Sequence, residues 1–225
     1  MIEHEPGWHD RAAAKSRPLF VPPAGETAQE AADRVKREGA EAAAVLLAEV
    51  PRRYRHCNRW TWKGDWPSAV DAWQPAPGAD PWALLLLGDP GVGKTHVATT
   101  LYLKLGAGFR RRRWVSVEDL VRSEQRAIAG RQSGDNRGEG GLDSALDCEL
   151  LLLDDVGSGR GTEWATALVA SVLYHRHEHM APTIITSNAK CAEDFAVFDH
   201  RISSRLREGT LRVLLEGPDR RSIRP

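Results

Sequence analysis

From about residue 82 onwards, short apolar runs alternate with helical patterns. Consecutive apolar residues predict buried strands, and apolar residues that recur every three to four positions predict helices. Strands are expected at 83–87, 114–117, 150–154, 183–187 and 211–215. Helices are expected at 94–105, 118–129, 163–176 and 199–206. Because strands that are apolar on both faces occur in parallel sheets covered by helices, the pattern predicts an α/β fold.

The first 51 residues follow a different pattern. Residues 1–26 are rich in Pro and Gly, which predicts an irregular arm. Thr27 and Glu30 form a capping-box signature at the start of an alanine-rich helix, and Pro51 ends that helix. We therefore expect a short helical extension at 1–51 that binds a partner, and one main domain at 52–225.

Composition narrows the class of protein. The 225 residues include 31 basic and 31 acidic side chains, so no global field draws the chain to nucleic acid or membrane. Three cysteines, odd in number and far apart, show no metal-ligand spacing. The first residues have no secretory signal, and the longest apolar run, 82–87, is too short to cross a bilayer. A cytoplasmic protein without membrane contact is expected.

A glycine-rich loop follows the first predicted strand of the main domain. It reads Gly-Asp-Pro-Gly-Val-Gly-Lys-Thr and opens the next helix. Glycines let backbone N–H groups turn inward and cradle phosphates, with Lys94 on the β- and γ-phosphates and Thr95 on magnesium. A glycine-rich turn with an incidental lysine is the alternative. The pattern predicts a site for ATP and Mg²⁺, with nucleotide contacts from Gly88, Asp89, Pro90, Gly91, Val92, Gly93, Lys94, Thr95 and His96.

Polar residues end two further strands. Asp154 and Asp155 follow the apolar run 150–153, at the end of the sheet where a parallel fold places its ligands. Asp154 is expected to hold magnesium together with Thr95, and Asp155 to orient or deprotonate the attacking water. Asn188 ends the strand 183–187 and is expected to position that water. The alternatives are strand-capping carboxylates and an asparagine that serves as a turn or helix cap.

Two arginines, Arg201 and Arg205, lie four residues apart on one face of the helix at 199–206. One of them is expected to act as an arginine finger across a subunit boundary. A solvated basic helix face is the alternative.

The order of these motifs resembles a known family. The segments Gly-Asp-Pro-Gly-Val-Gly-Lys-Thr-His, Leu-Leu-Leu-Asp-Asp-Val-Gly, Pro-Thr-Ile-Ile-Thr-Ser-Asn, Arg-Ile-Ser-Ser-Arg-Leu and Gly-Pro-Asp-Arg-Arg are similar, across about residues 50–221, to AAA+ ATPases of the DnaC/DnaI helicase-loader and IstB transposition-helper group. The resemblance implies a P-loop AAA+ core with a five-stranded parallel sheet between helices. Only 37 residues follow Asn188, so it also implies little or no C-terminal lid. The resemblance does not indicate which residues contact the nucleotide from the C-terminal side. Arg220 and Arg221 are the candidates.

The same resemblance implies residue roles and a function. Asn188 corresponds to sensor 1 and Arg205 to the arginine finger, so that nucleotide lies between subunits of a homo-oligomer. The implied function is an ATP-dependent loader that binds single-stranded DNA, engages a replicative helicase and releases it on hydrolysis. A transposition helper that presents target DNA to a transposase is the nearest alternative. A small-molecule kinase, with Asp155 activating a substrate hydroxyl, and a non-hydrolysing interaction module are alternatives of other classes.

Basic and aromatic clusters offer candidate DNA and partner contacts. Arginines on the helix at 118–129 and the loop after it can bind phosphates, or form a solvated helix face. The run 110–113 is interpreted as a solvated turn rather than a DNA patch. Tryptophans between 60 and 73 are expected to pack on the core, with base stacking or the docking of a partner as the alternatives. His175, His177 and His179 are interpreted as an exposed helix end rather than a metal site. The predicted DNA contacts are Arg122, Arg126, Arg131 and Arg137.

Overall fold

The computed structural model describes residues 27–132, 141–157, 162–191, 195 and 200–221 of the chain. The chain divides into two compact units, residues 1–42 and 43–225, and the division falls within helix α1 (Ala28–Glu49). The capping box predicted at the start of α1 is confirmed. The backbone N–H of Thr27 donates to Glu30 Oε2 at 2.8 Å, and that of Glu30 donates to Thr27 Oγ1 at 3.2 Å.

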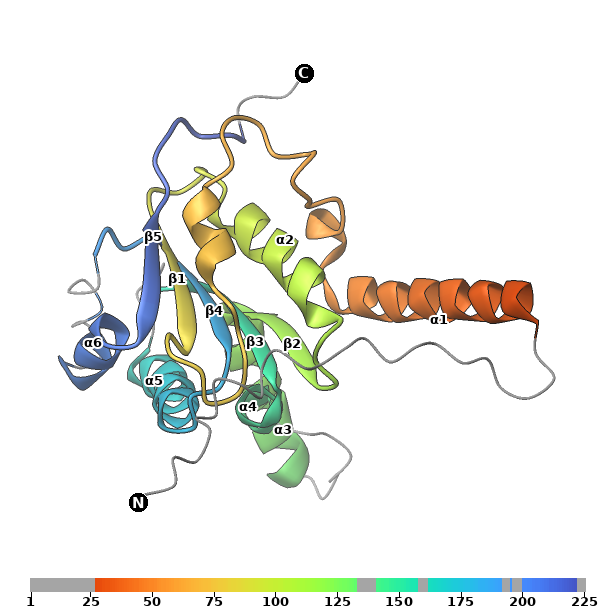
Figure 1. The fold of residues 1–225 in the computed structure, drawn as a ribbon. Coiled ribbons are helices and arrows are strands. Elements are labelled where there is room, and N and C mark those ends of the chain that lie inside the picture. The colour runs from red at the N-terminus through yellow and green to blue at the C-terminus, as the bar shows by residue number, and fades with distance from the viewer. Residues whose placement is uncertain (1–26, 133–140, 158–161, 192–194, 196–199, 222–225) are drawn as a thin grey trace, which may run out of the picture. The chain divides into compact units, whose positions relative to one another are not determined.

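The second unit contains a five-stranded sheet in the order β2-β3-β4-β1-β5 (Figure 1). Every neighbouring pair among these strands is parallel, and Leu84 of β1 pairs with Ile184 of β4 and Leu211 of β5. The predicted five-stranded parallel sheet is therefore confirmed. The strands are β1 (Ala83–Leu87), β2 (Arg112–Ser116), β3 (Leu150–Val156), β4 (Thr183–Ser187) and β5 (Thr210–Leu214).

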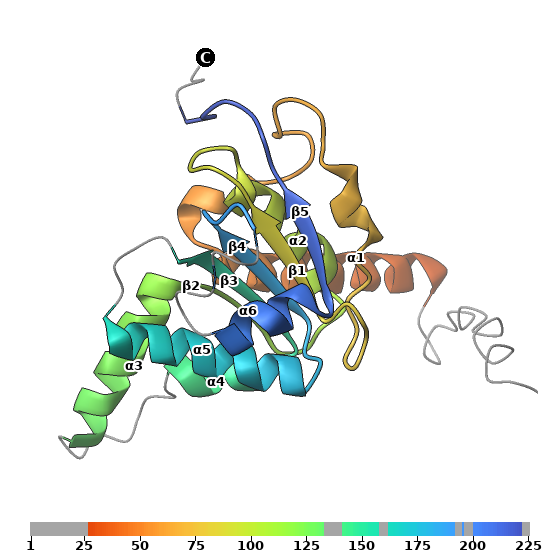
Figure 2. The ribbon, with the colours of Figure 1, turned by 90° about the vertical axis from the view of Figure 1, so that its left-hand side faces the viewer.

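Helices cover both faces of the sheet because successive strand residues point to opposite sides. Leu85 and Leu153 pack against α3, α4, α5 and α6, while Leu84 and Leu152 pack against α2 and the segment before β1. Figure 2 shows α5 and α6 crossing the first of these faces. Within the described ranges, no helix is long and apolar enough to span a membrane. The elements are α2 (Lys94–Gly106), α3 (Val117–Gln132), α4 (Gly141–Asp147), α5 (Glu163–Glu178), α6 (His200–Arg207) and the 3₁₀ turns η2 (Arg52–Tyr54) and η3 (Ser68–Ala72).

The helix predicted at 118–129 is longer in the structure, and helix α4 is not among the predicted elements. Helix α3 continues to Gln132, and α4 begins at Gly141, while residues 133–140 lie outside the described part of the chain. Gly141 packs closely on α3, because a Cβ there would lie 1.9 Å from Ser123 Oγ. The backbone N–H of Leu142 also donates to Glu124 Oε2 at 2.9 Å. Tertiary contact with α3, rather than local propensity, therefore stabilises α4.

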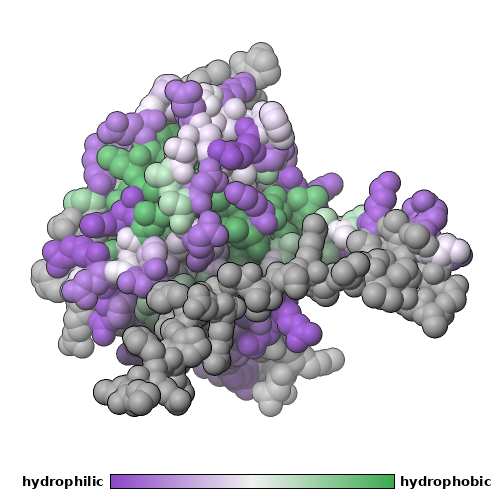
Figure 3. Space-filling model, in the orientation of Figure 1, coloured by the Kyte–Doolittle hydropathy of each residue, from purple (hydrophilic) through white to green (hydrophobic). Residues whose placement is uncertain are grey.

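The tryptophans divide between core and surface. Trp73 and Trp82 are buried, and Trp62 and Trp66 are half-buried with their rings edge-to-face at 5.9 Å. Trp60 is 96% exposed, so the predicted packing fails for this one side chain. Figure 3 shows hydrophilic side chains over much of the visible surface, with a hydrophobic area over the edge strand β5, where Leu214 is half exposed.

Candidate nucleotide site

The glycine-rich loop joins β1 to α2 in a conformation that requires glycine. Gly88, Gly91 and Gly93 have φ angles of 136°, 85° and 101°, which side chains rarely adopt. A Cβ at Gly88 would also lie 2.2 Å from the carbonyl oxygen of Leu215, and one at Gly93 would lie 2.6 Å from the Trp62 ring. The loop therefore curves closely around the N-terminus of α2, where the helix dipole favours an anion.

The side chain of Lys94, the first residue of α2, reaches back into this loop. It is buried, and Nζ donates to Gly88 O at 2.7 Å, to Asp89 O at 2.9 Å and to Asn188 Oδ1 at 2.8 Å. Burial lowers the pKa of the Lys94 ammonium, and the nearby carboxylates of Asp155 and Asp154 oppose that shift. The ammonium group thus joins the loop to the end of β4.

Asp154, at the end of β3, shares hydrogen bonds with two hydroxyl groups. Thr95 Oγ1 donates to Asp154 Oδ1 at 2.9 Å, and Thr186 Oγ1 donates to the same oxygen at 2.6 Å. Burial raises the pKa of the Asp154 carboxyl, while the bonds from Thr186 and Thr95 act in the opposite direction. A carboxylate and a hydroxyl at one point are the oxygen donors that Mg²⁺ prefers, so these residues fit the predicted ion.

Asp155 and Asn188 complete the cluster. Asp155 is exposed and has a φ of 66°, an uncommon conformation for a residue other than glycine. Its backbone N–H donates to Thr186 Oγ1 at 2.8 Å, and Asn188 Nδ2 donates to its carboxylate at 3.3 Å. The pairing of β3 with β4 is irregular between Leu153 and Val156, next to this turn. The structure thus brings Lys94, Thr95, Asp154, Asp155 and Asn188 together.

The segment after β5 also contacts the glycine-rich loop. The sequence had not determined which residues approach the loop from the C-terminal side. The backbone N–H of Arg220 donates to Gly91 O at 2.9 Å, and Arg220 Nε donates to Val92 O at 2.9 Å. The Arg220 guanidinium lies 4.1 Å from the centre of the Trp62 ring. The carboxylate of Asp219 occupies the space that a Cβ at Gly91 would need. This segment therefore supports the loop from its outer side.

His96 and Arg205 have other contacts in this chain. His96 Nε2 lies 3.0 Å from Asn58 O, and the imidazole ring lies 5.5 Å from that of Trp62. The guanidinium of Arg205 lies 4.5 Å from the centre of the Tyr174 ring on α5. The side chain of Arg201 is outside what the structure describes.

The predicted DNA contacts on α3 are partly engaged in ion pairs. Arg122 pairs with Glu118 at 2.5 Å and with Asp119 at 3.5 Å, and Arg131 pairs with Glu124 at 2.9 Å. Arg126 is exposed. Arg137 lies outside the described residues. The pairs of Arg122 and Arg131 would have to open before either side chain bound a phosphate.

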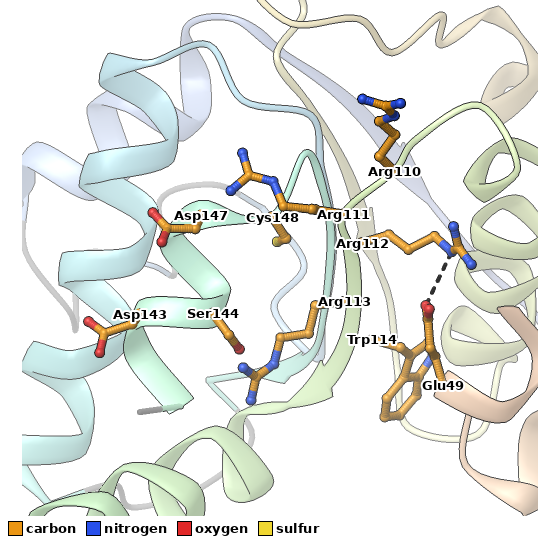
Figure 4. Close-up of a pocket in the computed structure, with 10 residues that line it drawn as sticks. All are labelled: Glu49, Arg110, Arg111, Arg112, Arg113, Trp114, Asp143, Ser144, Asp147 and Cys148. Atoms are coloured by element: carbon orange, nitrogen blue, oxygen red, sulfur yellow. Dashed lines mark ion pairs between the residues drawn. The ribbon is translucent and has the colours of Figure 1, made fainter. Parts of the chain in front are cut away.

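A separate pocket of about 560 Å³ lies where β2 and β3 begin, at the end of the strands opposite to the nucleotide site (Figure 4). Its most prominent lining residues are the four arginines 110–113, interpreted from the sequence as a turn. Arg112 points to Glu49 and pairs with it at 3.3 Å. Asp143 and Asp147 also line the pocket, so its charge is mixed.

The strand order, the glycine-rich loop between β1 and α2, and the acidic pair at the end of β3 define a P-loop protein with the AAA+ fold. The model of the family described as IstB-like ATP binding protein matches residues 80–206, and the chain belongs to that family.

Curated relatives include ATP-binding proteins of insertion sequences. That of IS5376 from Geobacillus stearothermophilus is 30% identical over 114 residues, which are 49% of this chain and 41% of the relative. That of IS21 from Pseudomonas aeruginosa is 30% identical over 124 residues, which are 55% of this chain and 44% of the relative. The matches thus span less than half the length of each relative.

Solved structures share the fold. The DnaC helicase loader superposes with a TM-score of 0.58 at 24% identity, covering 74% of this chain and 100% of that one. DnaI superposes with a TM-score of 0.56 at 23% identity, covering 76% and 94%.

Proposed function

We propose that the protein hydrolyses ATP and uses hydrolysis as a switch that releases a client protein from DNA. The observation that carries the proposal is that Lys94, Asp154, Asp155 and Asn188 meet at one point. They come from the start of α2, from β3 and from the residue after β4. Membership of a family of ATP-binding proteins supports the choice of nucleotide.

Each residue of the cluster has a distinct role in this proposal. ATP with Mg²⁺ supplies the phosphoanhydride bond that is cleaved and the metal charge that offsets the charge of the phosphates. Lys94 exchanges its carbonyl partners for phosphate oxygens, and Thr95 and Asp154 hold the metal. Asp155 is the exposed carboxylate of the pair, and it orients or deprotonates water. Asn188, bonded to both Lys94 and Asp155, positions the same water.

Arg205 is proposed to act on the nucleotide of a neighbouring subunit. Its guanidinium stacks on Tyr174 of α5, a helix on the opposite face of the sheet from α2. An arginine finger that acts in trans contributes about 10³–10⁵ in rate, so hydrolysis would require assembly into a homo-oligomer.

The first candidate client is a replicative helicase, engaged on single-stranded DNA. The shared fold with the DnaC helicase loader and DnaI is compatible with this assignment. In this proposal residues 1–51 bind the client and residues 52–225 form the ATPase domain.

The second candidate client is a transposase. The specific observation in its favour is that the two relatives at 30% identity are ATP-binding proteins of insertion sequences. Here the protein would hold target DNA for the transposase, and bent duplex rather than single strands would be preferred.

Native mass spectrometry of the full chain with ATP, single-stranded or bent duplex DNA, and the helicase or a transposase from the same source separates these candidates. A nucleotide-dependent complex with the helicase ring supports the loader. Oligomers on DNA that ignore the helicase but retain a transposase support the second candidate. Mixing Arg205→Ala with Lys94→Ala subunits tests the finger, because each variant lacks one half of a shared site and the mixture restores some activity only in trans. Absence of ATP binding by the wild type would overturn the whole proposal.

A further inference from the structure

Three side chains that commonly bind metals gather beside the nucleotide loop. His56 and Cys57 lie in the segment before β1, and His96 lies in the first turn of α2. One ligand atom of each residue lies within 4.8 Å of the ligand atoms of the other two. Because His96 is far along the chain from the other two, spacing in the sequence does not indicate this cluster.

The cluster has an inner side and an outer side. The Cys57 side chain is 3% exposed, His96 is half-buried, and His56 is exposed to solvent. The rings of His56 and His96 lie 6.0 Å apart between centres, at 74°. An ion can therefore approach past His56 and meet the Cys57 thiol below.

Backbone and hydroxyl groups hold the cluster in place. Asn58 O lies 3.0 Å from His96 Nε2, so this carbonyl can accept the ring proton and leave the lone pair on Nδ1. Thr61 Oγ1 donates to His56 O at 2.9 Å, and the backbone N–H of Thr61 donates to Asn58 Oδ1 at 3.0 Å. Metal-binding histidines commonly have such an outer partner, because it fixes the ring orientation.

The chemistry of the donors selects the ion. Two imidazoles and one thiolate suit Zn²⁺, whereas Mg²⁺ and Ca²⁺ prefer oxygen ligands. Zinc bonds of about 2.0–2.3 Å place tetrahedral ligand atoms about 3.5 Å apart, so the cluster has to contract by about 1 Å. Rotation of the exposed His56 side chain can supply much of that movement. The fourth position is left for water.

We propose that His56, Cys57 and His96 form a zinc site that fastens the segment 56–62 to the first turn of α2. Trp62 lies in this segment, and its ring packs against Gly93 of the nucleotide loop. Zinc would thus hold the segment against the loop while remaining separate from the magnesium site, whose donors are oxygens.

The test titrates the full chain, without nucleotide, with Zn²⁺ alone against a chromophoric chelator. We expect one ion per chain with a Kd below about 1 μM, weaker than the binding of zinc by structural sites with four protein ligands. His56→Ala and Cys57→Ala should each weaken binding by more than about 100-fold, because each removes a ligand. Co²⁺ should give thiolate charge-transfer absorption in the wild type and lose it in Cys57→Ala.

The control variant addresses three other side chains that could bind zinc. His175 and His179 stack at 4.2 Å, and Cys191 is an exposed thiol, so each is an alternative metal binder. A variant with His175→Ala, His179→Ala and Cys191→Ala should keep the full zinc affinity and the cobalt band. Loss of zinc binding in this variant, or unchanged binding in both His56→Ala and Cys57→Ala, would overturn the proposal. Because His56 is exposed, its variant should fold, and thermal unfolding without zinc checks this.

Discussion

Arg176, near the end of α5, is fully buried and connects α5 to α4 and to the start of β4. Its Nε donates to Thr183 Oγ1 at 2.7 Å and its Nη2 to Pro182 O at 2.7 Å, at the start of β4. Its Nη1 donates to Cys148 O at 2.8 Å and to Ala145 O at 3.0 Å, beside α4. Replacing it with methionine removes the donors and keeps much of the side-chain volume.

The magnitude follows from these four bonds. At about 1 kcal/mol each they contribute about 4 kcal/mol, and buried carbonyl groups left without a donor add to the loss. The methionine side chain offsets part of this by filling the space. We therefore expect Arg176→Met to lower the free energy of unfolding by about 3–5 kcal/mol, a large share of the about 5–15 kcal/mol typical of a domain.

Urea unfolding followed by far-ultraviolet circular dichroism measures the change by linear extrapolation. The matched control is Arg126→Met, on the exposed side of α3, which should stay within about 0.5 kcal/mol of the wild type. Arg176→Lys keeps the charge but not the forked geometry of the guanidinium. Its loss of unfolding free energy should lie between those of Arg126→Met and Arg176→Met. A loss below about 1 kcal/mol in Arg176→Met, with an unchanged m-value, would refute the reasoning.

Three further predictions concern the nucleotide site. Gly93→Ala should abolish binding of a fluorescent ATP analogue, because the new Cβ would lie 2.6 Å from Trp62 at a φ of 101°. Asp155→Asn should keep ATP binding and lower phosphate release by about 10²–10⁴-fold, the usual contribution of a general base. Arg220→Ala removes the bond to Val92 O and the contact with Trp62, and should weaken ATP binding in a filter assay by about three- to tenfold, equivalent to about 1 kcal/mol.

Each of these results has a control. Gly39→Ala, at a helix position with open space around it, should leave ATP binding unchanged, and equal binding by Gly93→Ala would contradict the steric argument. If Asp155→Asn hydrolyses ATP at the wild-type rate, another group must act as the base. For Arg220, the matched variant is Arg212→Ala on β5, and equal effects of the two would show that only general charge matters.

The sheet was predictable because its strands are short and apolar. The predicted limits of β1 and β4 match the observed ones, since both strands are buried along their whole length. The cluster around Lys94 also follows from local patterns, because a parallel sheet places the ends of β3 and β4 beside the loop after β1. These contacts depend on topology alone.

Other features depend on contacts between distant segments. The residues of α4 give only a weak local signal for a helix. The helix becomes evident only from the close approach of Gly141 to α3. Nothing near Arg176 in the sequence distinguishes a buried arginine from a solvated one. The contact of Arg220 with the loop, and the gathering of His96 with His56, likewise appear only when the chain is folded.

At the end of β4, side-chain hydroxyl groups form hydrogen bonds with the backbone of β3, in place of part of the regular backbone pairing. Thr186 Oγ1 accepts the backbone N–H of Asp155, and Ser187 Oγ donates to Val156 O at 2.6 Å. The amide proton of Asp155 is therefore protected by one threonine hydroxyl, which also donates to Asp154. The hydrogen–deuterium exchange rate of the Asp155 amide therefore reports whether the Thr186 hydroxyl stays bonded to Asp154 and Asp155. Any change that turns the Thr186 hydroxyl away would register at a single peptide, before the sheet itself opens.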